Sequence, residues 1–416
     1  MIFYSKFKGK TVADRAAVLF LLIYCLLNVL SHTIVQLAGG VGNISAIYIL
    51  TFYFVFFYGV ETENRKVRIH FISFAVFLAV YVICMQFVYR KPASYSVFGL
   101  NFETHVWNLV SFVPVTVCAV CMALKTDGKQ ALWIRRVLIF VLLATIVPSM
   151  FMLARYPGLA KQTATGRGKY VPFLINYAVV YGLAVILPYF FLVNRDRRKI
   201  WQYAMGILVF ACICFSSFFI AIVAAVFGVL VCLVLKVKNV LLRRSLILLA
   251  LICAAVFVFS GAAYNVLIFV AARVPSKLIA ARASQLALFL RTGSTGDATV
   301  RIDMYRRALR LVARHPVMGS VIWEDVQLSG HSEFLDVWGG SGIVALLGLI
   351  FFFASLYKAN TGFLKTAGHS AALKASTLVL LFVSLTNPVF SSPAICLLWI
   401  IAPMVFTGSE TESVAS

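Results

Sequence analysis

Long apolar runs recur from one end of the chain to the other, and short polar connectors separate them. Hydrophobic residues make up 62% of the 416 residues, well above the roughly half that soluble domains contain. A run of ~20 apolar residues is long enough to cross a bilayer. The pattern therefore predicts an all-α, polytopic membrane protein and excludes a water-soluble fold.

The apolar runs divide into about twelve expected spans in a single membrane domain over residues 1–416. The first run, Ala16 to Leu37, is longer than the apolar part of a cleaved signal, so we expect it to be retained. We expect the block 203–235 to form two short helices that turn near Ser216–Ser217; one long tilted helix would reverse the topology of everything after it. The expected spans are 16–37, 44–60, 70–88, 107–124, 134–153, 171–193, 203–217, 219–235, 245–270, 340–357, 372–387 and 391–407.

The net charge of +23 follows in part from topology. With both chain ends inside, the inner connectors are rich in lysine and arginine, as the positive-inside rule requires. Examples are the connectors around Arg65–Arg68, Arg195–Lys199 and Lys236–Arg244. The one long outer segment, 271–339, is also basic, which favours an anionic ligand such as a phosphate or pyrophosphate. Docking of this face onto anionic lipid headgroups is the alternative.

The outer segment contains an expected amphipathic helix that starts at an Asp297 N-cap and ends near Arg314, before His315-Pro316. Its apolar positions share one face, and its basic positions share the other. We expect this helix to lie in the membrane interface with its apolar side toward the lipid. The apolar face consists of Val300, Met304, Ala308, Leu311 and Val312.

Four arginines of the outer connectors are candidate ligands for a diphosphate: Arg301, Arg282, Arg291 and Arg155. The guanidinium fork matches phosphate oxygens in geometry as well as in charge. The loop that follows Arg155 is the other basic outer connector and could close over the same ligand. Lipid-facing arginines that only extend toward the headgroups are the alternative interpretation.

His331-Ser332-Glu333 lies just before a Gly-rich start of a membrane helix. A histidine beside a carboxylate suits a general base that deprotonates a hydroxyl nucleophile, so His331 and Glu333 are the candidate catalytic residues. We interpret Asp336 as structural. The outer tip that begins at Asn387-Pro388 suits a wall of a sugar pocket, although an ordinary turn between helices explains it as well.

The sequence indicates no metal or nucleotide cofactor. Cys118 and Cys121 have the spacing of zinc ligands, but they lack a second pair or a histidine cluster. A Walker loop, an HExxH sequence and an acidic Asp-x-Asp cluster are all missing. Neither a metal-dependent reaction nor a nucleic-acid partner is therefore expected.

Three elements follow one another in the outer segment: an arginine that opens the amphipathic helix, His-Pro-x-x-Gly at His315–Gly319, and Gly-His-Ser-x-Phe-Leu followed by Gly-x-x-Gly-Ile over Gly330–Ile343. This order resembles the C-terminal signature of the bacterial O-antigen polymerase and O-antigen ligase superfamily. The match covers about residues 301–350, and the layout of many helices with one large outer loop is similar over most of the chain.

The resemblance implies a metal-independent membrane glycosyltransferase of the GT-C type in the bacterial inner membrane. Its donor would be a glycan on undecaprenyl diphosphate, presented on the external side. In the family, external arginines bind the diphosphate and a histidine activates the acceptor hydroxyl; Arg301 and His331 match those positions. The implied partners are the lipid-linked glycan, an acceptor glycan and membrane lipid, and a chain-length regulator is left open.

Two features bear on the kind of member that the chain resembles. Many members, ligases especially, carry an arginine next to the serine at their eighth helix, where this chain has Phe215-Ser216-Ser217-Phe218. Some polymerases show Arg-x10-Gly in two external loops, and Arg155/Gly166 and Arg282/Gly293 fit this pattern. We therefore expect a polymerase of lipid-linked repeat units, with ligation to lipid A core as the alternative. A small-solute transporter and a lipid-binding scaffold are the alternatives of another class. A transporter should place ionisable residues at mid-membrane, and the expected spans are nearly free of them.

Overall fold

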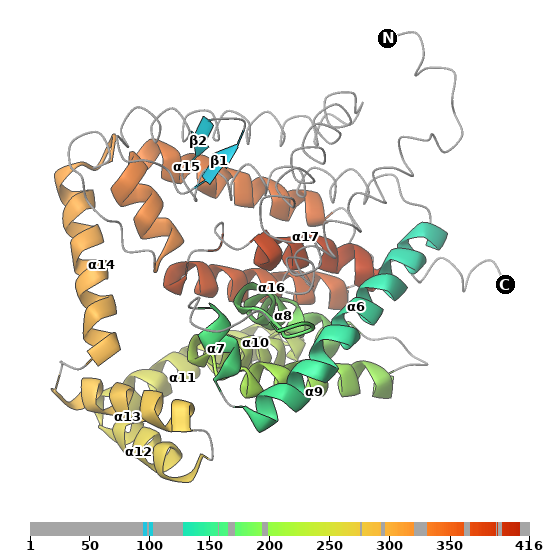
Figure 1. The fold of residues 1–416 in the computed structure, drawn as a ribbon, viewed down its shortest axis with the longest axis horizontal. Helices are drawn as coiled ribbons and strands as arrows, with labels where there is room; N and C mark the ends of the chain where they lie inside the picture. Colours follow the sequence, from blue (N-terminus) through green and yellow to red (C-terminus); the bar gives the residue numbers. More distant parts are fainter. Residues whose placement is uncertain are drawn as a thin grey trace, which may run out of the picture.

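The computed structural model describes residues 95–97, 100–102, 128–156, 158–164, 171–193, 199–274, 277–292, 296–319, 331–361, 367–387, 389 and 393–407. Four expected spans, 16–37, 44–60, 70–88 and 107–124, lie outside these residues, as do Cys118 and Cys121. The described part of the chain is almost wholly helical, as expected (Figure 1). A short antiparallel hairpin, β1 (Tyr95–Val97) and β2 (Leu100–Phe102), is the exception in that part.

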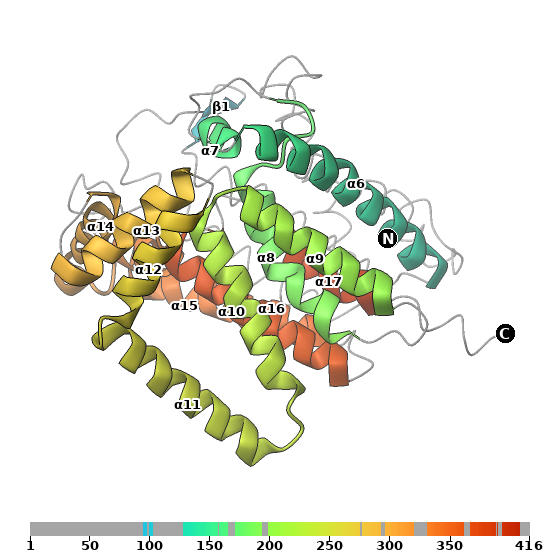
Figure 2. The ribbon, with the colours of Figure 1, turned by 90° about the horizontal axis from the view of Figure 1, so that it is seen from below.

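The helix at the centre of the bundle is α8 (Tyr177–Leu192). Its sequence is apolar on every side and holds no charged residue, which is typical of a helix that is buried all round. It packs against α9 (Lys199–Phe215), α10 (Phe219–Lys236), α16 (Ala367–Thr386) and α17 (Pro393–Thr407), which surround it in Figure 2. The core of the described bundle is therefore formed by segments that lie far apart in the sequence.

The expected break in the block 203–235 is confirmed, because α9 ends at Phe215 and α10 begins at Phe219. Ser216 closes the end of α9 by donating its hydroxyl to the Ile213 carbonyl at 2.6 Å. Ser217 follows with a positive φ of 60°, which reverses the chain direction. A positive φ costs energy in a residue that has a side chain, so this turn is held by its surroundings.

The expected single span 245–270 is wrong. The structure has α11 (Val240–Phe259) and then a separate helix, α12 (Ala262–Arg273). Gly261, with a φ of 76°, separates them. Glycine adopts this left-handed conformation without the steric penalty of a Cβ, and so it commonly ends helices. Because the residues on both sides of Gly261 are apolar, the hydropathy pattern does not reveal this break.

The described residues of the segment 271–339 that follow α12 belong to further helices and the turn after α14. These helices are α13 (Lys277–Thr292), α14 (Gly296–Arg314) and the start of α15 (Glu333–Thr361). The expected end of α14 at Arg314 is confirmed, but the helix begins at Gly296, so Asp297 lies in its first turn and is not the N-cap. A short helix, α7 (Leu159–Ala164), lies in the other basic connector.

The remaining expected spans agree with helices of the structure. Span 134–153 lies inside α6 (Gly128–Arg155), and α16 and α17 match 372–387 and 391–407 within a few residues. The residues from 171 to 176 form a turn before α8 instead of its first turns. By length and composition, two described helices, Phe219–Lys236 and Gly368–Thr386, are long and apolar enough to cross a membrane.

Candidate functional site

The two Gly-containing motifs of the outer segment meet in one joint. The turn at His315–Gly319 lies against the Gly339–Gly342 stretch of α15, where the helix is kinked at Gly342. Pro316 links the turn to α15, because its carbonyl accepts hydrogen bonds from the Ile343 N–H at 2.9 Å and the Trp338 indole N–H at 3.1 Å. The joint fixes the direction in which the start of α15 leaves the bundle.

Glycine is required at both sides of the joint. Gly319 has a φ of 76° and Gly342 a φ of 83°. A Cβ on Gly319 would overlap the Gly340 carbonyl, and a Cβ on Gly342 would overlap the Val317 carbonyl. Since these neighbours are backbone atoms, no side-chain rotation could relieve the overlap. Gly319 and Gly342, which belong to the two motifs described from the sequence, therefore have a structural role here.

Helix α14 packs its apolar face on protein. Ala308, Leu311 and Val312 are buried, and a Cβ built on Gly339 of α15 would lie 3.7 Å from Val312 Cγ2 and 3.8 Å from Leu311 Cβ. This corrects the expectation that the apolar side of the helix faces the membrane. A helix with one apolar stripe needs a partner surface, and in this structure α15 supplies it.

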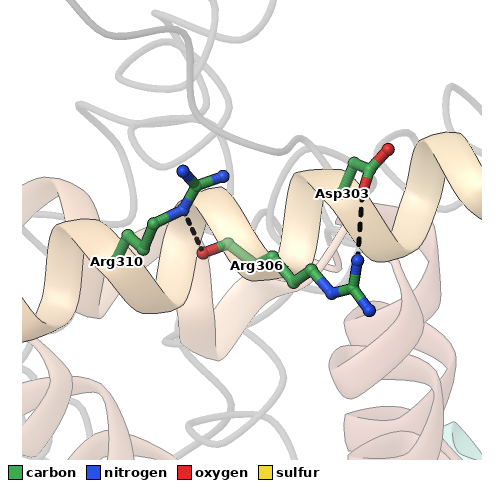
Figure 3. A network of polar contacts seen from close by, with 3 residues as sticks. All are labelled: Asp303, Arg306 and Arg310. Carbon is green, nitrogen blue, oxygen red and sulfur yellow. Dashed lines mark hydrogen bonds and ion pairs between the residues drawn. The ribbon is translucent and has the colours of Figure 1, made fainter.

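The opposite face of α14 is exposed and basic (Figure 3). Arg306 lies 3.6 Å from Asp303 across one turn of the helix, and both side chains are largely exposed. The Arg310 Nε donates to the Arg306 carbonyl at 3.4 Å. An ion pair that is open to solvent contributes little stability, so these arginines act mainly as a positively charged surface.

His331-Ser332-Glu333 forms the N-terminal cap of α15. The Ser332 hydroxyl accepts from the Leu335 N–H at 3.4 Å, and the Ser332 N–H donates to the Asp336 carboxylate at 3.4 Å. This reciprocal arrangement satisfies donors that a helix start leaves without partners. The expected structural role of Asp336 is confirmed, and the cap holds His331 and Glu333 at a fixed helix end.

Glu333 is buried and reaches across to the tip between α16 and α17. Its Oε2 accepts a hydrogen bond from the Val389 N–H at 2.7 Å, and its exposed fraction is 8%. A buried carboxylate is stable only where donors satisfy it. The outer tip, which the sequence suggested as a wall of a pocket, therefore contacts the candidate catalytic segment directly.

The same tip is tied to the start of α8. The Tyr177 hydroxyl donates to the Asn387 Oδ1 at 2.6 Å across 210 residues of sequence. The Tyr177 ring also meets the ring of Phe218, edge to face at 5.3 Å between centroids. Phe218 belongs to the α9–α10 turn. Four connectors thus converge on one site: the start of α8, the α9–α10 turn, the start of α15 and the tip after α16.

Helix α14 joins this site through Tyr305. The Tyr305 hydroxyl donates to the main-chain carbonyl of His331 at 3.2 Å. Position 301 lies one helical turn before Tyr305, and residues four apart share one face of a helix. The backbone of α14 therefore carries Arg301 on the side of the helix that approaches His331.

The other three arginines lie on other elements. Arg155 ends α6 and lies 5.7 Å from the ring centroid of its neighbour Tyr156. Arg291, in the last turn of α13, donates to the Tyr264 hydroxyl at 3.3 Å and stacks on the same ring. Neither contact joins a guanidinium to His331. The backbone of Arg282 lies in α13.

Sequence reasoning missed Tyr305, which bonds to His331, and the Tyr177–Asn387 pair, which ties the tip after α16 to α8. The sequence indicates the Asn387-Pro388 tip as a possible wall of a pocket, but nothing in the sequence connects this tip to α8 or α15. Tyrosines are frequent in this chain, and a long-range pair leaves no periodic signal. Among the described residues, no group of three His, Cys, Asp or Glu side chains could hold a metal ion.

We expect Tyr177→Phe to lower the free energy of unfolding by about 1–3 kcal/mol, because it removes the donor from a buried amide oxygen. Asn387 is only 2% exposed, so water has little access to replace the lost hydroxyl. Thermal unfolding in detergent measures the effect. Tyr203→Phe is the matched control, since its ring keeps its contacts with Phe191 and Lys236. Equal losses in the two variants would contradict the role of the Tyr177–Asn387 bond.

No protein-family model matches the chain, and no curated protein matches it either.

Proposed function

We propose that this protein is a membrane glycosyltransferase that polymerises oligosaccharide repeat units carried on undecaprenyl diphosphate. One observation supports this most: the His331–Glu333 segment lies where four outer connectors and α14 converge, with Glu333 bonded to the Val389 N–H of the outer tip. A catalytic group needs such a rigid, locally satisfied frame to hold it against a substrate. The sequence resemblance supplies the substrate class.

In the proposed reaction, a hydroxyl oxygen of the incoming unit attacks the anomeric carbon of the growing chain. His331 takes the proton of that hydroxyl as general base. A new glycosidic C–O bond forms while the C–O bond to the diphosphate breaks, and the electron pair leaves with undecaprenyl diphosphate. The glycosyl diphosphate already stores the driving energy, so the reaction needs neither a nucleotide nor an oxidant.

Basic side chains would stabilise the charge that grows on the leaving diphosphate, a preorganised electrostatic role. Arg301 is the foremost candidate, because α14 carries it one turn from Tyr305 and hence near His331. Arg282 and Arg155 are further candidates. Arg291 is not in this set, because its contact with Tyr264 places its guanidinium against α12 and not against the His331 segment. Glu333 would act by holding the tip after α16 and the His331 segment in fixed positions relative to each other.

The proposal includes the membrane arrangement that the sequence predicts. The chain would cross the bacterial inner membrane about twelve times in a GT-C-type fold, with both ends inside and the His331 site on the external side. Its support is that the connectors converging at His331 are those that the charge pattern assigns to the external side. Lipid-linked repeat units would reach the site from the outer leaflet.

The test is a reaction of the purified protein with an undecaprenyl-diphosphate-linked repeat unit in detergent, without added metal. We expect a ladder of repeat multiples by gel and mass spectrometry, and we expect Arg301→Ala to lose most of it. Transfer that occurs only when lipid A core is added would replace the polymerase by a ligase. Inactivity of a folded protein with both acceptors, together with solute uptake in liposomes, would contradict an enzymatic role and favour a transporter.

A further inference from the structure

Helices α12 and α13 pack side by side as a helical hairpin, which we call the α12–α13 hairpin (Ala262–Thr292). It lies at the edge of the bundle in both views (Figures 1 and 2). The buried side chains include Ala263, Ala283 and Ala287. Small side chains such as these let two helices approach closely and leave the larger side chains of the hairpin for its outer surface.

The outer surface of the α12–α13 hairpin is apolar. On α12, Val266 and Phe269 are 48% and 55% exposed, and they share a face with Arg273 at helical spacing. On α13, Leu288 and Leu290 are 45% and 37% exposed, next to the exposed Arg291. Each helix therefore presents large apolar groups immediately beside a cation. This combination is typical of helices that lie in a membrane interface.

Both arginines of this surface are stacked on aromatic rings. The Arg273 guanidinium lies 4.4 Å from the ring centroid of Phe269, and Arg291 lies 5.4 Å from that of Tyr264. A guanidinium over a ring face is held by its charge and keeps N–H groups at its edge for an anion. The stacking thus fixes two cations at the level of the apolar side chains.

The hairpin supplies no counter-charge of its own. No acidic residue occurs in the sequence between Asp196 and Asp297, a stretch that includes the hairpin and all of α9, α10 and α11. Lys277 adds a third exposed basic residue at the start of α13. Fixed cations beside apolar groups complement a surface that is anionic at the headgroups and apolar beneath them.

We propose that the α12–α13 hairpin docks on the anionic headgroups of the bilayer, with Val266, Phe269 and Leu288 inserted below them. Arg273 and Arg291 bind lipid phosphates in this arrangement. The inference stands apart from the proposed glycosyl transfer, because it concerns phospholipid at the protein edge and not the His331 site. The proposed ligand is a bilayer phospholipid. Soluble phosphate carries the same kind of anionic group and is the alternative ligand.

The experiment is hydrogen–deuterium exchange on the whole protein in lipid nanodiscs of phosphatidylcholine, with and without phosphatidylglycerol. We expect phosphatidylglycerol to slow exchange in peptides covering 262–292, by roughly fivefold for each arginine engaged. High salt should weaken the protection, since exposed charges are screened. The double variant Arg273→Gln/Arg291→Gln should lose it, while the control Arg243→Gln/Arg244→Gln on α11 should keep it in the same peptides.

Peptides of α8 report whether each variant is folded, because this helix is buried in the core. Equal exchange of the hairpin with and without phosphatidylglycerol, in protein with a protected α8, would overturn the proposal. Inorganic phosphate added to phosphatidylcholine nanodiscs is the second arm. If phosphate alone gave the full protection, the hairpin would be a soluble-anion site and the docking proposal would be wrong.

Discussion

His331→Ala is expected to remove the polymer ladder while leaving the protein folded and able to bind the lipid-linked substrate. Loss of a general base typically costs between about a hundredfold and ten-thousandfold in rate. The contact of residue 331 with Tyr305 uses its main-chain carbonyl. An alanine therefore keeps this bond while it deletes the imidazole. Initial rates of product formation, beside thermal unfolding, measure the two properties separately.

His315→Ala is the matched control for this prediction. His315 is also half-buried in the outer segment, and its main-chain hydrogen bonds to Leu311 and Gly319 survive the change. We expect the control to retain most of the activity. A His331→Ala protein with undiminished turnover would show that another group takes the proton. Equal losses in both variants would instead indicate that the outer segment as a whole had been disturbed.

The site was predictable from the sequence only in its local parts. The His331-Ser332-Glu333 triplet is contiguous, and its nearness to a Gly-rich helix start is a sequence property. The contacts that hold it are not: Glu333 bonds to Val389, and Tyr177 bonds to Asn387 across 210 residues. Such bonds depend on how the helices pack around α8, and packing of uniformly apolar helices leaves no periodic signal that identifies their partners.

The fold, like the site, was predictable from the sequence in its local features but not in its long-range packing. Hydrophobic runs predicted where most described helices lie, and the serine pair at 216–217 indicated a real turn. The break at Gly261 was missed because the residues on both sides are apolar, so hydropathy continues through it. The apolar face of α14 was identified correctly, yet its partner proved to be α15 and not lipid. An apolar stripe predicts burial, but it does not distinguish protein from membrane as the surface that buries it.

Gly342→Ala is expected to prevent correct folding, with a loss of more than about 4 kcal/mol in the free energy of unfolding. Two effects combine at this residue. Its φ of 83° is strained for any residue with a side chain, and the new methyl would overlap the Val317 carbonyl. The joint must then open, which breaks the hydrogen bond between the Ile343 N–H and the Pro316 carbonyl. The yield of monodisperse protein and its thermal unfolding in detergent measure the effect.

Gly339→Ala is the matched control, only three residues earlier in the same Gly-rich stretch. A Cβ there would meet its nearest neighbour, the Ala308 carbonyl, at 3.4 Å, which is an ordinary contact distance, and its backbone is helical. Alanine is also the better helix former, so we expect stability close to that of the parent. The pair separates the two roles that this Gly-rich motif beside the candidate catalytic histidine can have. If Gly342→Ala folds normally but loses activity, the glycine is needed for substrate binding or catalysis. If Gly342→Ala fails to fold while Gly339→Ala is tolerated, the motif is needed to form the joint that sets the direction of α15.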